Sequence, residues 1–186
     1  MRIIGGRFKG STIEAPRGVL SRPPLAVIRE AVFNIIGPEI EGRSILDLFA
    51  GSGSLGFEAL SRGAARVHFV DSARRCAQML ARNSRKLGVS SLCTVARQDA
   101  VEFVRDWQGM PFDFIFVDPP FLSGKAEETL LAASGTHVLA PGALVVVRVH
   151  WREVFALPEY LVQVKKRKFG ESVVMFLQIR SSVADQ

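Results

Sequence analysis

The chain has 186 residues and a formal net charge of +6, and 48% of its residues are hydrophobic. This length and composition predict one globular domain with a sizeable core, and no apolar run is long enough for a membrane-spanning helix. Charges recur through the first 30 residues, which argues against a signal peptide, and the two cysteines are widely spaced with no metal-ligand pattern. We therefore expect a cytoplasmic protein with reduced thiols and no bound metal.

The positive charge is concentrated near the N-terminus. Residues 1–38 hold six Lys and Arg against two Asp and Glu, whereas residues 39–149 hold twelve of each kind. A basic segment joined to a neutral body suggests a polyanionic substrate, although a surface that serves only solubility could have the same composition.

Residues 1–24 are predicted to form a basic extension, and residues 25–186 the main domain. Short apolar segments on either side of Gly5, Gly6 and Gly10 suggest a small hairpin, and prolines then prevent regular structure. The extension could hold RNA phosphates, with an aromatic side chain to stack on a base, or it could be a flexible tail. The candidate RNA contacts are Arg2, Arg7, Lys9, Arg17 and Arg22, with Phe8 as the stacking residue.

Residues 25–36 have the apolar spacing of an amphipathic helix, which Gly37 and Pro38 would end. Arg29 is a polar residue of this helix, and it could contact RNA or simply pair with a neighbouring carboxylate. From residue 43 onward, strand-like and helix-like segments alternate. Strands are expected at 44–49, 66–70, 92–96, 112–117 and 143–149, and helices at 55–62, 72–87, 100–107 and 127–133.

This alternation predicts a parallel sheet with helices on both faces. Two further strand-like runs, 160–168 and 172–179, are separated by only three residues. That gap is too short for a helical crossover, so the two runs should form an antiparallel hairpin. The predicted fold class is α/β, with a Rossmann-like, mostly parallel seven-stranded sheet that ends in an antiparallel hairpin. This architecture resembles that of the class I methyltransferases.

The segment 45–56, ILDLFAGSGSLG, predicts a nucleotide-sized site where a strand ends and a helix begins. Gly51 and Gly53 allow a ligand to approach closely, and the first amides of the helix can receive an anionic group. The glycine spacing, with Asp71 further along the chain, also fits a dinucleotide site, and an ordinary tight turn is a third interpretation. Asp47 favours S-adenosylmethionine, because a carboxylate would oppose a pyrophosphate but suit a cationic amino-acid group.

Acidic residues lie at or near the ends of four successive predicted strands. The carboxyl ends of parallel strands share one edge of a sheet, where ligands of such folds bind. Asp71 could accept the hydroxyls of a ribose, Asp99 could accept the adenine amino group, and Asp47 could lie near the methionine ammonium. Asp99 could equally be only the N-cap of the helix that follows it. The candidate cofactor-binding residues are Asp47, Phe49, Ala50, Gly51, Ser52, Gly53, Asp71 and Asp99.

The sequence Asp118-Pro119-Pro120-Phe121 is the candidate catalytic segment. An amino group conjugated to a ring is a poor nucleophile, because its lone pair is delocalised. The Asp118 carboxylate and the Pro119 carbonyl could accept its hydrogens and orient the lone pair towards a methyl group, while the prolines stiffen the loop. Phe121 offers a face on which the target base could stack. Alternatively, the segment could be only a structural Pro-Pro turn that follows a buried strand.

The chain resembles the RsmD-type family of bacterial small-subunit ribosomal RNA guanine-N2 methyltransferases. The resemblance rests on the segments RIIGG, RP, VIREAVFN, DLFAGSG, FVD, VDPPF and the late FG, which together span nearly the whole chain. It implies that S-adenosylmethionine methylates the exocyclic N2 amino group of a guanine in 16S rRNA, leaving S-adenosylhomocysteine. The rRNA would be bound within the small ribosomal subunit or an assembly intermediate, without a membrane or metal. The family usually has Thr where this chain has Pro24.

Three other functions remain open from the sequence. The first is another methyltransferase with the same catalytic segment, acting on adenine N6 in DNA or RNA or on a protein glutamine. DNA enzymes of this kind usually carry a separate recognition domain, for which the chain leaves little room. The second is a nucleotide-dependent RNA-binding module without turnover, which would not need Asp118 and Phe121. The third is a dinucleotide oxidoreductase, in which case NADH would stabilise the protein against thermal unfolding.

Overall fold

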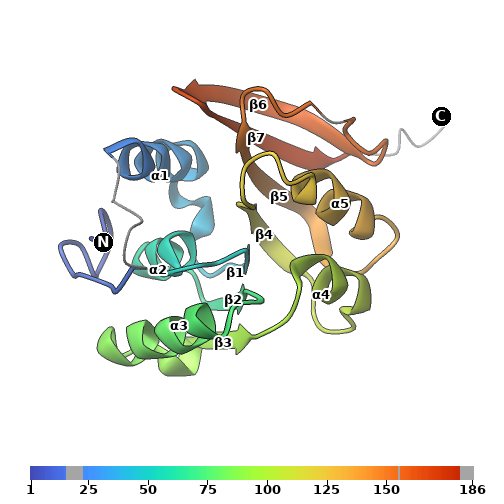
Figure 1. Cartoon of the computed structure of the whole chain (residues 1–186). Helices are drawn as coiled ribbons and strands as arrows, with labels where there is room; N and C mark the ends of the chain where they lie inside the picture. Colours follow the sequence, from blue (N-terminus) through green and yellow to red (C-terminus); the bar gives the residue numbers. More distant parts are fainter. Residues whose placement is uncertain (16–22, 155, 181–186) are drawn as a thin grey trace.

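Five parallel strands form the larger part of one sheet in the computed structural model, which describes residues 1–15, 23–154 and 156–180 (Figure 1). All residues of the first strand are buried, because helices cover the sheet on both sides, and this explains its nearly continuous apolar sequence. The parallel strands are β1 (Ser44–Leu48), β2 (Arg66–Val70), β3 (Cys93–Ala96), β4 (Phe112–Val117) and β5 (Leu139–His150).

An antiparallel hairpin forms one end of the sheet. Strand β7 (Ser172–Ile179) pairs antiparallel with both β5 and β6 (Leu161–Phe169), so that β6 is the edge strand. The strand order is β3-β2-β1-β4-β5-β7-β6. The predicted fold class, a Rossmann-like and mostly parallel sheet ending in an antiparallel hairpin, is therefore confirmed.

Helices α1, α2 and α3 pack on one face of the sheet, and α4 and α5 pack on the other (Figure 1). The buried residues of α3 include Cys76, Met79, Leu80 and Asn83, whose spacing of three or four gives the helix one buried stripe. In the part of the chain that the structure describes, no helix combines the length and apolar character needed to cross a membrane. The bounds are α1 (Pro23–Ile36), η1 (Gly37–Ile40), α2 (Ser54–Ser61), α3 (Arg74–Lys86), η2 (Ser90–Leu92), α4 (Ala100–Asp106) and α5 (Lys125–Ala132).

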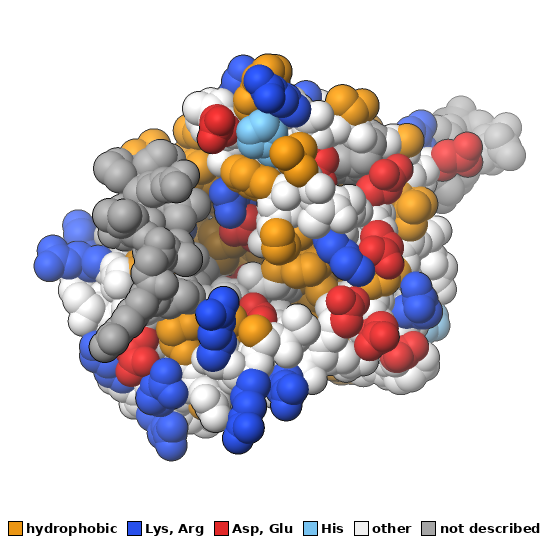
Figure 2. All heavy atoms as spheres, in the orientation of Figure 1, with side chains coloured by type: hydrophobic (Ala, Val, Ile, Leu, Met, Phe, Trp, Pro, Cys, Tyr) orange, Lys and Arg blue, Asp and Glu red, His pale blue; other side chains and the backbone are white. Residues whose placement is uncertain are grey.

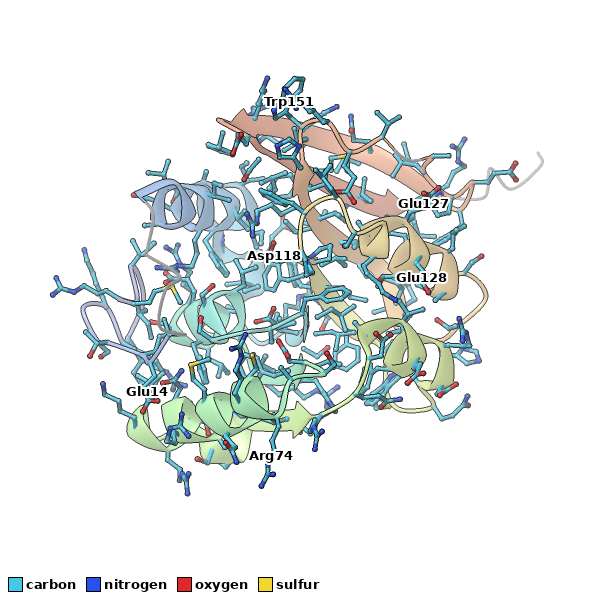
Figure 3. The ribbon with its side chains drawn as sticks, viewed as in Figure 1. Glu14, Arg74, Asp118, Glu127, Glu128 and Trp151 are labelled. Atoms are coloured by element: carbon cyan, nitrogen blue, oxygen red, sulfur yellow. The ribbon has the colours of Figure 1, made fainter. Side chains whose placement is uncertain are left out.

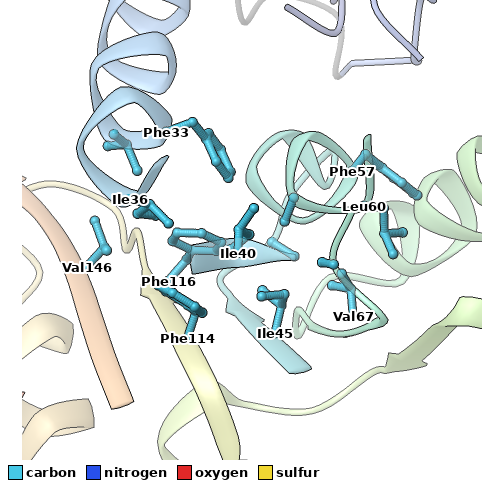
Figure 4. Packing of buried hydrophobic residues seen from close by; sticks show 14 of the residues in the cluster. Phe33, Ile36, Ile40, Ile45, Phe57, Leu60, Val67, Phe114, Phe116 and Val146 are labelled. Atoms are coloured by element: carbon cyan, nitrogen blue, oxygen red, sulfur yellow. The ribbon is translucent and has the colours of Figure 1, made fainter. Parts of the chain in front are cut away.

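Aromatic packing fixes α1 and α2 against the sheet. Phe33 of α1 lies 5.8 Å from Phe116 of β4, measured between ring centroids, and Phe57 of α2 lies 4.8 Å from Phe69 of β2. Figure 4 shows Phe33, Phe57 and Phe116 within the same apolar cluster. Helices α1 and α2 are therefore held against the sheet by large buried side chains, which gives the carboxyl ends of β1 and β4 a rigid support.

Residues 1–15 form the predicted hairpin, which is closed by an antiparallel bridge between Arg2 and Thr12. Ile3 and Ile13 are buried in the same core cluster as residues of α1 and α2. The hairpin is thus packed onto the body of the protein, and it is drawn beside α2 and α3 in Figure 1. The division of the chain into an extension and a main domain at residue 24 stays a prediction.

Strand β5 begins earlier than the sequence predicts. Pro141 and Gly142 suggest a turn, yet Leu139 already pairs with Phe112 of β4. The register with β4 shifts before it becomes regular at Leu144, where the pairing with β7 also starts. The proline therefore lies in an irregular stretch of the strand, where the missing amide donor is tolerated.

Candidate active site

The turn between β1 and α2 is tightly wound at the carboxyl end of β1. Phe49, Gly51 and Gly53 have positive φ values of 58°, 56° and 79°, and the amide of Gly53 donates to the carbonyl of Ala50 at 2.7 Å. A Cβ on Gly53 would lie 2.6 Å from a methyl carbon of Leu80, so glycine is the residue that fits. The turn expected from the glycine pattern is present.

Two carboxylates hold this turn through its backbone amides. Oδ2 of Asp71 accepts from the Gly51 amide of the turn at 2.8 Å, and its Oδ1 accepts from the amide of Ala73, just before α3, at 2.9 Å. Asp47 is 2% exposed, and its Oδ2 accepts from the Gly56 amide at 2.9 Å. Burial raises the pKa of the Asp47 carboxyl well above its usual range; the Gly56 amide opposes this rise, and Asp118 and Asp71 add to it. Asp47 of β1 and Asp71, which follows β2, therefore bind the glycine turn and the helix after it through backbone amides.

Two neighbouring cavities at this edge of the sheet share Phe49, Asp118 and Arg148 in their walls. One, of about 290 Å³, is lined by the carboxylates of Asp71 and Asp99. The other, of about 260 Å³, is lined by the glycine turn and by mostly apolar side chains of α1, β5 and β7. Figure 2 shows a hollow near the centre of this face. Among the described residues, no three or more His, Cys, Asp or Glu side chains could hold a metal ion.

Asp99 is the N-cap of α4. Its Oδ1 accepts from the amides of Val101 and Glu102 at 2.8 and 3.3 Å, and its Oδ2 lies 3.9 Å from Nζ of Lys125. The capping role considered for this residue is confirmed. Because Asp99 also lines the cavity with Asp71, its contact with an adenine stays a prediction. Asp47, by contrast, is buried and does not line either cavity, and its contact with a ligand ammonium likewise stays a prediction.

Asp118 follows the last residue of β4, and Arg148 of β5 holds its carboxylate. Nε of Arg148 donates to Oδ1 of Asp118 at 2.5 Å, and the guanidinium carbon lies 4.8 Å from the ring centroid of Phe121. Burial raises the pKa of the Asp118 carboxyl, and the neighbouring guanidinium opposes that rise. Arg148 therefore favours the ionised form of Asp118, which is the form that accepts hydrogen bonds, while it covers one face of Phe121.

Sequence reasoning does not identify Arg148. The available signal is a lone arginine in the apolar run 143–149, because a charged side chain on a buried strand normally has a partner. The identity of that partner depends on the pairing of β4 with β5, which sets Val147 opposite Val117 and so brings Arg148 beside Asp118. This register cannot be read from the run itself.

The candidate RNA contacts in the N-terminal hairpin are exposed where the structure describes them. Arg2, Arg7 and Lys9 all point their charges to solvent, and the guanidinium of Arg7 lies 4.5 Å from the ring centroid of Phe8. Arg17 and Arg22 lie outside the described residues. The hairpin reaches the candidate site, since Met1 lines the same cavity as the glycine turn.

Glu58 of α2 anchors this hairpin. It is fully buried, and its carboxylate accepts from the amides of Ile4 and Gly5 at 2.9 and 2.8 Å. It also forms ion pairs with Arg62 and with Arg29 of α1. Arg29 is 4% exposed, so it fits the other role considered for it, pairing with a carboxylate, and is a poor candidate for contact with RNA.

The parallel sheet, the glycine turn and the acidic strand ends define the Rossmann-like fold of the class I methyltransferases. More narrowly, the chain belongs to the family described as conserved hypothetical protein 95, whose model matches residues 1–178. This is the RsmD-type methyltransferase family, and the resemblance stated above is confirmed.

Relatives of known name cover most of the chain. Ribosomal RNA small subunit methyltransferase D of Haemophilus influenzae is 35% identical over 172 residues, which cover 91% of this chain and 89% of the relative. The protein of the same name from Escherichia coli K12 is 38% identical over 147 residues, or 79% of this chain and 73% of the relative. The solved structure of yhhF from Escherichia coli has a TM-score of 0.87 at 32% identity, covering 98% of this chain and 99% of that one.

Proposed function

We propose that this protein transfers a methyl group from S-adenosylmethionine to the exocyclic N2 amino group of a guanine in 16S rRNA. Family membership and the names of the relatives support an rRNA small-subunit methyltransferase. The observation that carries the chemistry is the position of Asp118, which lies in the shared wall of the two cavities beside a half-exposed aromatic ring.

The residues around the two cavities fit S-adenosylmethionine, which supplies an electrophilic methyl group when it is bound. Asp71 and Asp99 offer carboxylate acceptors to the ribose and adenine in one cavity. Phe49, Ala50, Gly51, Ser52 and Gly53 supply the turn that borders the other cavity, and Asp47 supports that turn from beneath.

Asp118 and the carbonyl of Pro119 act as acceptors for the two hydrogens of the target amine. This contact directs the nitrogen lone pair out of conjugation with the ring, and the prolines keep both acceptors in a fixed loop. The nitrogen becomes acidic only once it is methylated, so a strong general base is not required. Arg148 supports this role, because its positive charge opposes the rise that burial causes in the pKa of Asp118 and so favours the ionised carboxylate.

Arg2, Arg7 and Lys9 hold phosphates of the RNA on the side of the site formed by the hairpin. Their exposure and positive charge support this role, and so does Met1 of the same hairpin, which lines the cavity beside the glycine turn. Phe121, which is 36% exposed, receives the face of the flipped guanine.

Identification of the methylated nucleoside tests the proposal. The purified protein is incubated with labelled S-adenosylmethionine and either naked 16S rRNA or small subunits from a strain without the modification. The RNA is then digested and the nucleosides are compared with standards by mass spectrometry. We expect label in N2-methylguanosine. Label in N6-methyladenosine, or in protein with none in RNA, would contradict the guanine assignment and support the other methyltransferase considered above.

A further inference from the structure

Three aromatic rings lead from the candidate catalytic loop to the surface of the protein. The ring of Phe121 lies 5.4 Å from that of His150, and His150 lies 5.9 Å from Trp151, measured between centroids. Trp151 is 46% exposed although it is a large apolar side chain. Figure 3 shows Asp118 near the centre of the molecule and Trp151 at its top edge, so the rings extend outward from the site.

Basic side chains lie over the outer ring. The guanidinium of Arg152 is 4.9 Å and the ammonium of Lys168 is 5.0 Å from the ring centroid of Trp151. Lys166 precedes Lys168 by two residues on the edge strand β6, so both project from the same face of that strand. Blue basic side chains beside hydrophobic atoms are visible at the top of Figure 2, which has the same orientation as Figure 3.

Backbone contacts fix the turn that carries these rings. The amide of Trp151 donates to the carbonyl of Glu171 at 2.9 Å, and the amide of Arg152 donates to Nδ1 of His150 at 3.2 Å. Oε2 of Glu153 accepts from the amide of Leu122 at 2.9 Å, which ties the turn to the loop that contains the candidate catalytic residues. The backbone that carries Trp151 is therefore tied to the loop that carries Phe121.

Two acidic residues lie in the same region and limit its positive charge. Glu153 is engaged by the loop amide, and Oε1 of Glu171 lies 3.9 Å from Nε2 of His150, with its side chain largely exposed. Arg152 and Lys168 are the basic side chains next to the Trp151 ring. We refer to His150, Trp151, Arg152 and Lys168, which lie beyond Phe121, as the aromatic platform.

We propose that the aromatic platform binds a nucleotide that neighbours the target guanine in the RNA chain. The neighbouring base stacks on Trp151, and Arg152 and Lys168 hold the adjoining phosphates. This inference rests on the proposed function, because it assumes that the target base occupies the face of Phe121 next to Asp118. Trp151 is separated from Phe121 by His150, so it is placed for the next base along the strand and not for the target itself.

The physical reason for such a platform is the cost of removing a base from its stack. When the target guanine leaves its neighbours, the exposed face of the adjoining base loses a stacking partner, and an aromatic side chain can replace it. Stacking on an indole ring tolerates any base, since every base has a π face, so the platform would add affinity without reading sequence. The nearby cations add an attraction to phosphate that depends on salt concentration.

Steady-state kinetics test this proposal, with naked 16S rRNA or small subunits as the varied substrate, whichever the unmodified protein methylates. We expect Trp151→Ala to raise KM for RNA about tenfold, with kcat and cofactor affinity nearly unchanged, and Trp151→Phe to restore most of the loss. The chain has only one other tryptophan, Trp107, which packs against Phe103 and Phe112 at ring-centroid distances of 5.0 and 5.1 Å. Trp107→Phe is therefore the matched control, and it should leave KM for RNA unchanged.

The same control variant provides a direct readout of stacking, because Trp151 is then the only tryptophan. Titration with a single-stranded RNA should quench its fluorescence with a midpoint that matches the affinity of the unmodified protein. An unchanged KM for Trp151→Ala, or no change in fluorescence at saturating RNA, would overturn the proposal. If the unmodified protein methylates both naked RNA and subunits, an effect of Trp151→Ala on subunits alone would point to a ribosomal protein and would also overturn it.

These outcomes are separable from a failure of the proposed function. If the unmodified protein methylates no RNA, or yields a product other than N2-methylguanosine, the proposed function fails whatever the tryptophan variants do. The fluorescence titration and the binding affinity of Trp151→Ala for RNA still decide whether the platform stacks a base. If the unmodified protein and Trp151→Ala both produce N2-methylguanosine with the same KM for RNA, the proposed function stands and the platform proposal fails.

Discussion

The carboxylates at the two ends of the candidate site, which we name after their proposed ligands the cofactor end and the base end, are held in different ways. At the cofactor end, Asp71 and Asp47 accept from backbone amides of the glycine turn and the helix after it, at 2.8 and 2.9 Å. At the base end, Asp118 is held by the side chain of Arg148, which also covers a face of Phe121. The backbone therefore sets the cofactor end in advance, whereas rotation of a few side chains can rearrange the base end.

This difference suits the two ligands. A small cofactor can enter a preformed pocket, and preorganisation lowers the entropy lost on binding. A base that arrives on a large RNA must be extruded first, so the groups that receive it need some freedom until docking is complete. We expect Arg148 to release part of its contact with Asp118 or Phe121 when the guanine enters.

The largest expected effect is that of Asp118→Ala. Loss of the acceptor should lower kcat by at least about 10²-fold, because the amine would no longer be oriented. Cofactor affinity should stay close to that of the unmodified protein, since the cofactor end is held by other residues. Single-turnover methyl transfer and calorimetry measure the two quantities, with Asp118→Asn as an isosteric control. A large loss of cofactor affinity in both variants would show that Asp118 belongs to the cofactor end.

Asp71→Ala should affect the opposite end. We expect cofactor binding to weaken by about 1.5–3 kcal/mol, the range for a lost hydrogen bond to a charged group. The glycine turn should also loosen, because the Gly51 amide loses its acceptor, and the start of α3 loses the bond from the Ala73 amide. Calorimetry measures the cofactor affinity of Asp71→Ala and of Asp71→Asn. Because Asn keeps one acceptor oxygen, the difference between the two variants separates the loss of the charge from the loss of the acceptor. Unchanged affinity in the alanine variant would remove Asp71 from the cofactor site.

Arg148→Ala should change how activity depends on pH. Arg148 opposes the rise that burial causes in the pKa of Asp118, so its removal should raise that pKa further. The acidic limb of the kcat profile would then move to higher pH, so that the loss is largest in acid and activity recovers as the pH rises. Arg148→Lys restores a positive charge and should move the limb part of the way back. A loss that is uniform across pH would mean that Arg148 acts only through its packing on Phe121.

The smallest expected effect concerns the hairpin. Replacing Arg2, Arg7 and Lys9 by Ala should reduce the slope of log affinity for RNA against log salt by about two, because fewer counterions are released. Point changes are preferable to deletion, since removing the hairpin would deprive the buried Glu58 of two amide donors. Arg105→Ala, at an exposed position on α4, is the control. An unchanged slope in the triple variant would place the RNA surface elsewhere, for example along β6.

Much of the architecture could be predicted because local signals were strong. Strand β4 is a short, mostly apolar run that ends just before Asp118, and its observed bounds match the predicted ones. Helix α3 has a regular buried stripe, and each of its ends lies within two residues of the predicted end. The glycine turn and the catalytic segment carry residue types whose conformational restrictions are themselves informative. These features need only neighbours in sequence to be recognised.

Features that depend on distant contacts could not be predicted in the same way. The contact between Arg148 and Asp118 follows from the register of two strands, and the burial of Arg29 follows from its pairing with Glu58 on another helix. Asp99 combines a local role as a helix cap with a place in the cavity wall, and only the first of these has a local signal. Sequence spacing alone does not specify such pairings, because they join segments far apart in the chain.

The most direct test of the central claim compares the products formed by the unmodified protein and by Asp118→Ala at saturating cofactor, on naked 16S rRNA and on small subunits from a strain without the modification. Nucleosides from both reactions are quantified by mass spectrometry, and cofactor binding is confirmed in the same preparations. We predict N2-methylguanosine from the unmodified protein and almost none from the variant, although the variant still binds S-adenosylmethionine. Formation of N2-methylguanosine at equal rates by both proteins would contradict the assignment of Asp118 as the acceptor that orients the guanine amine.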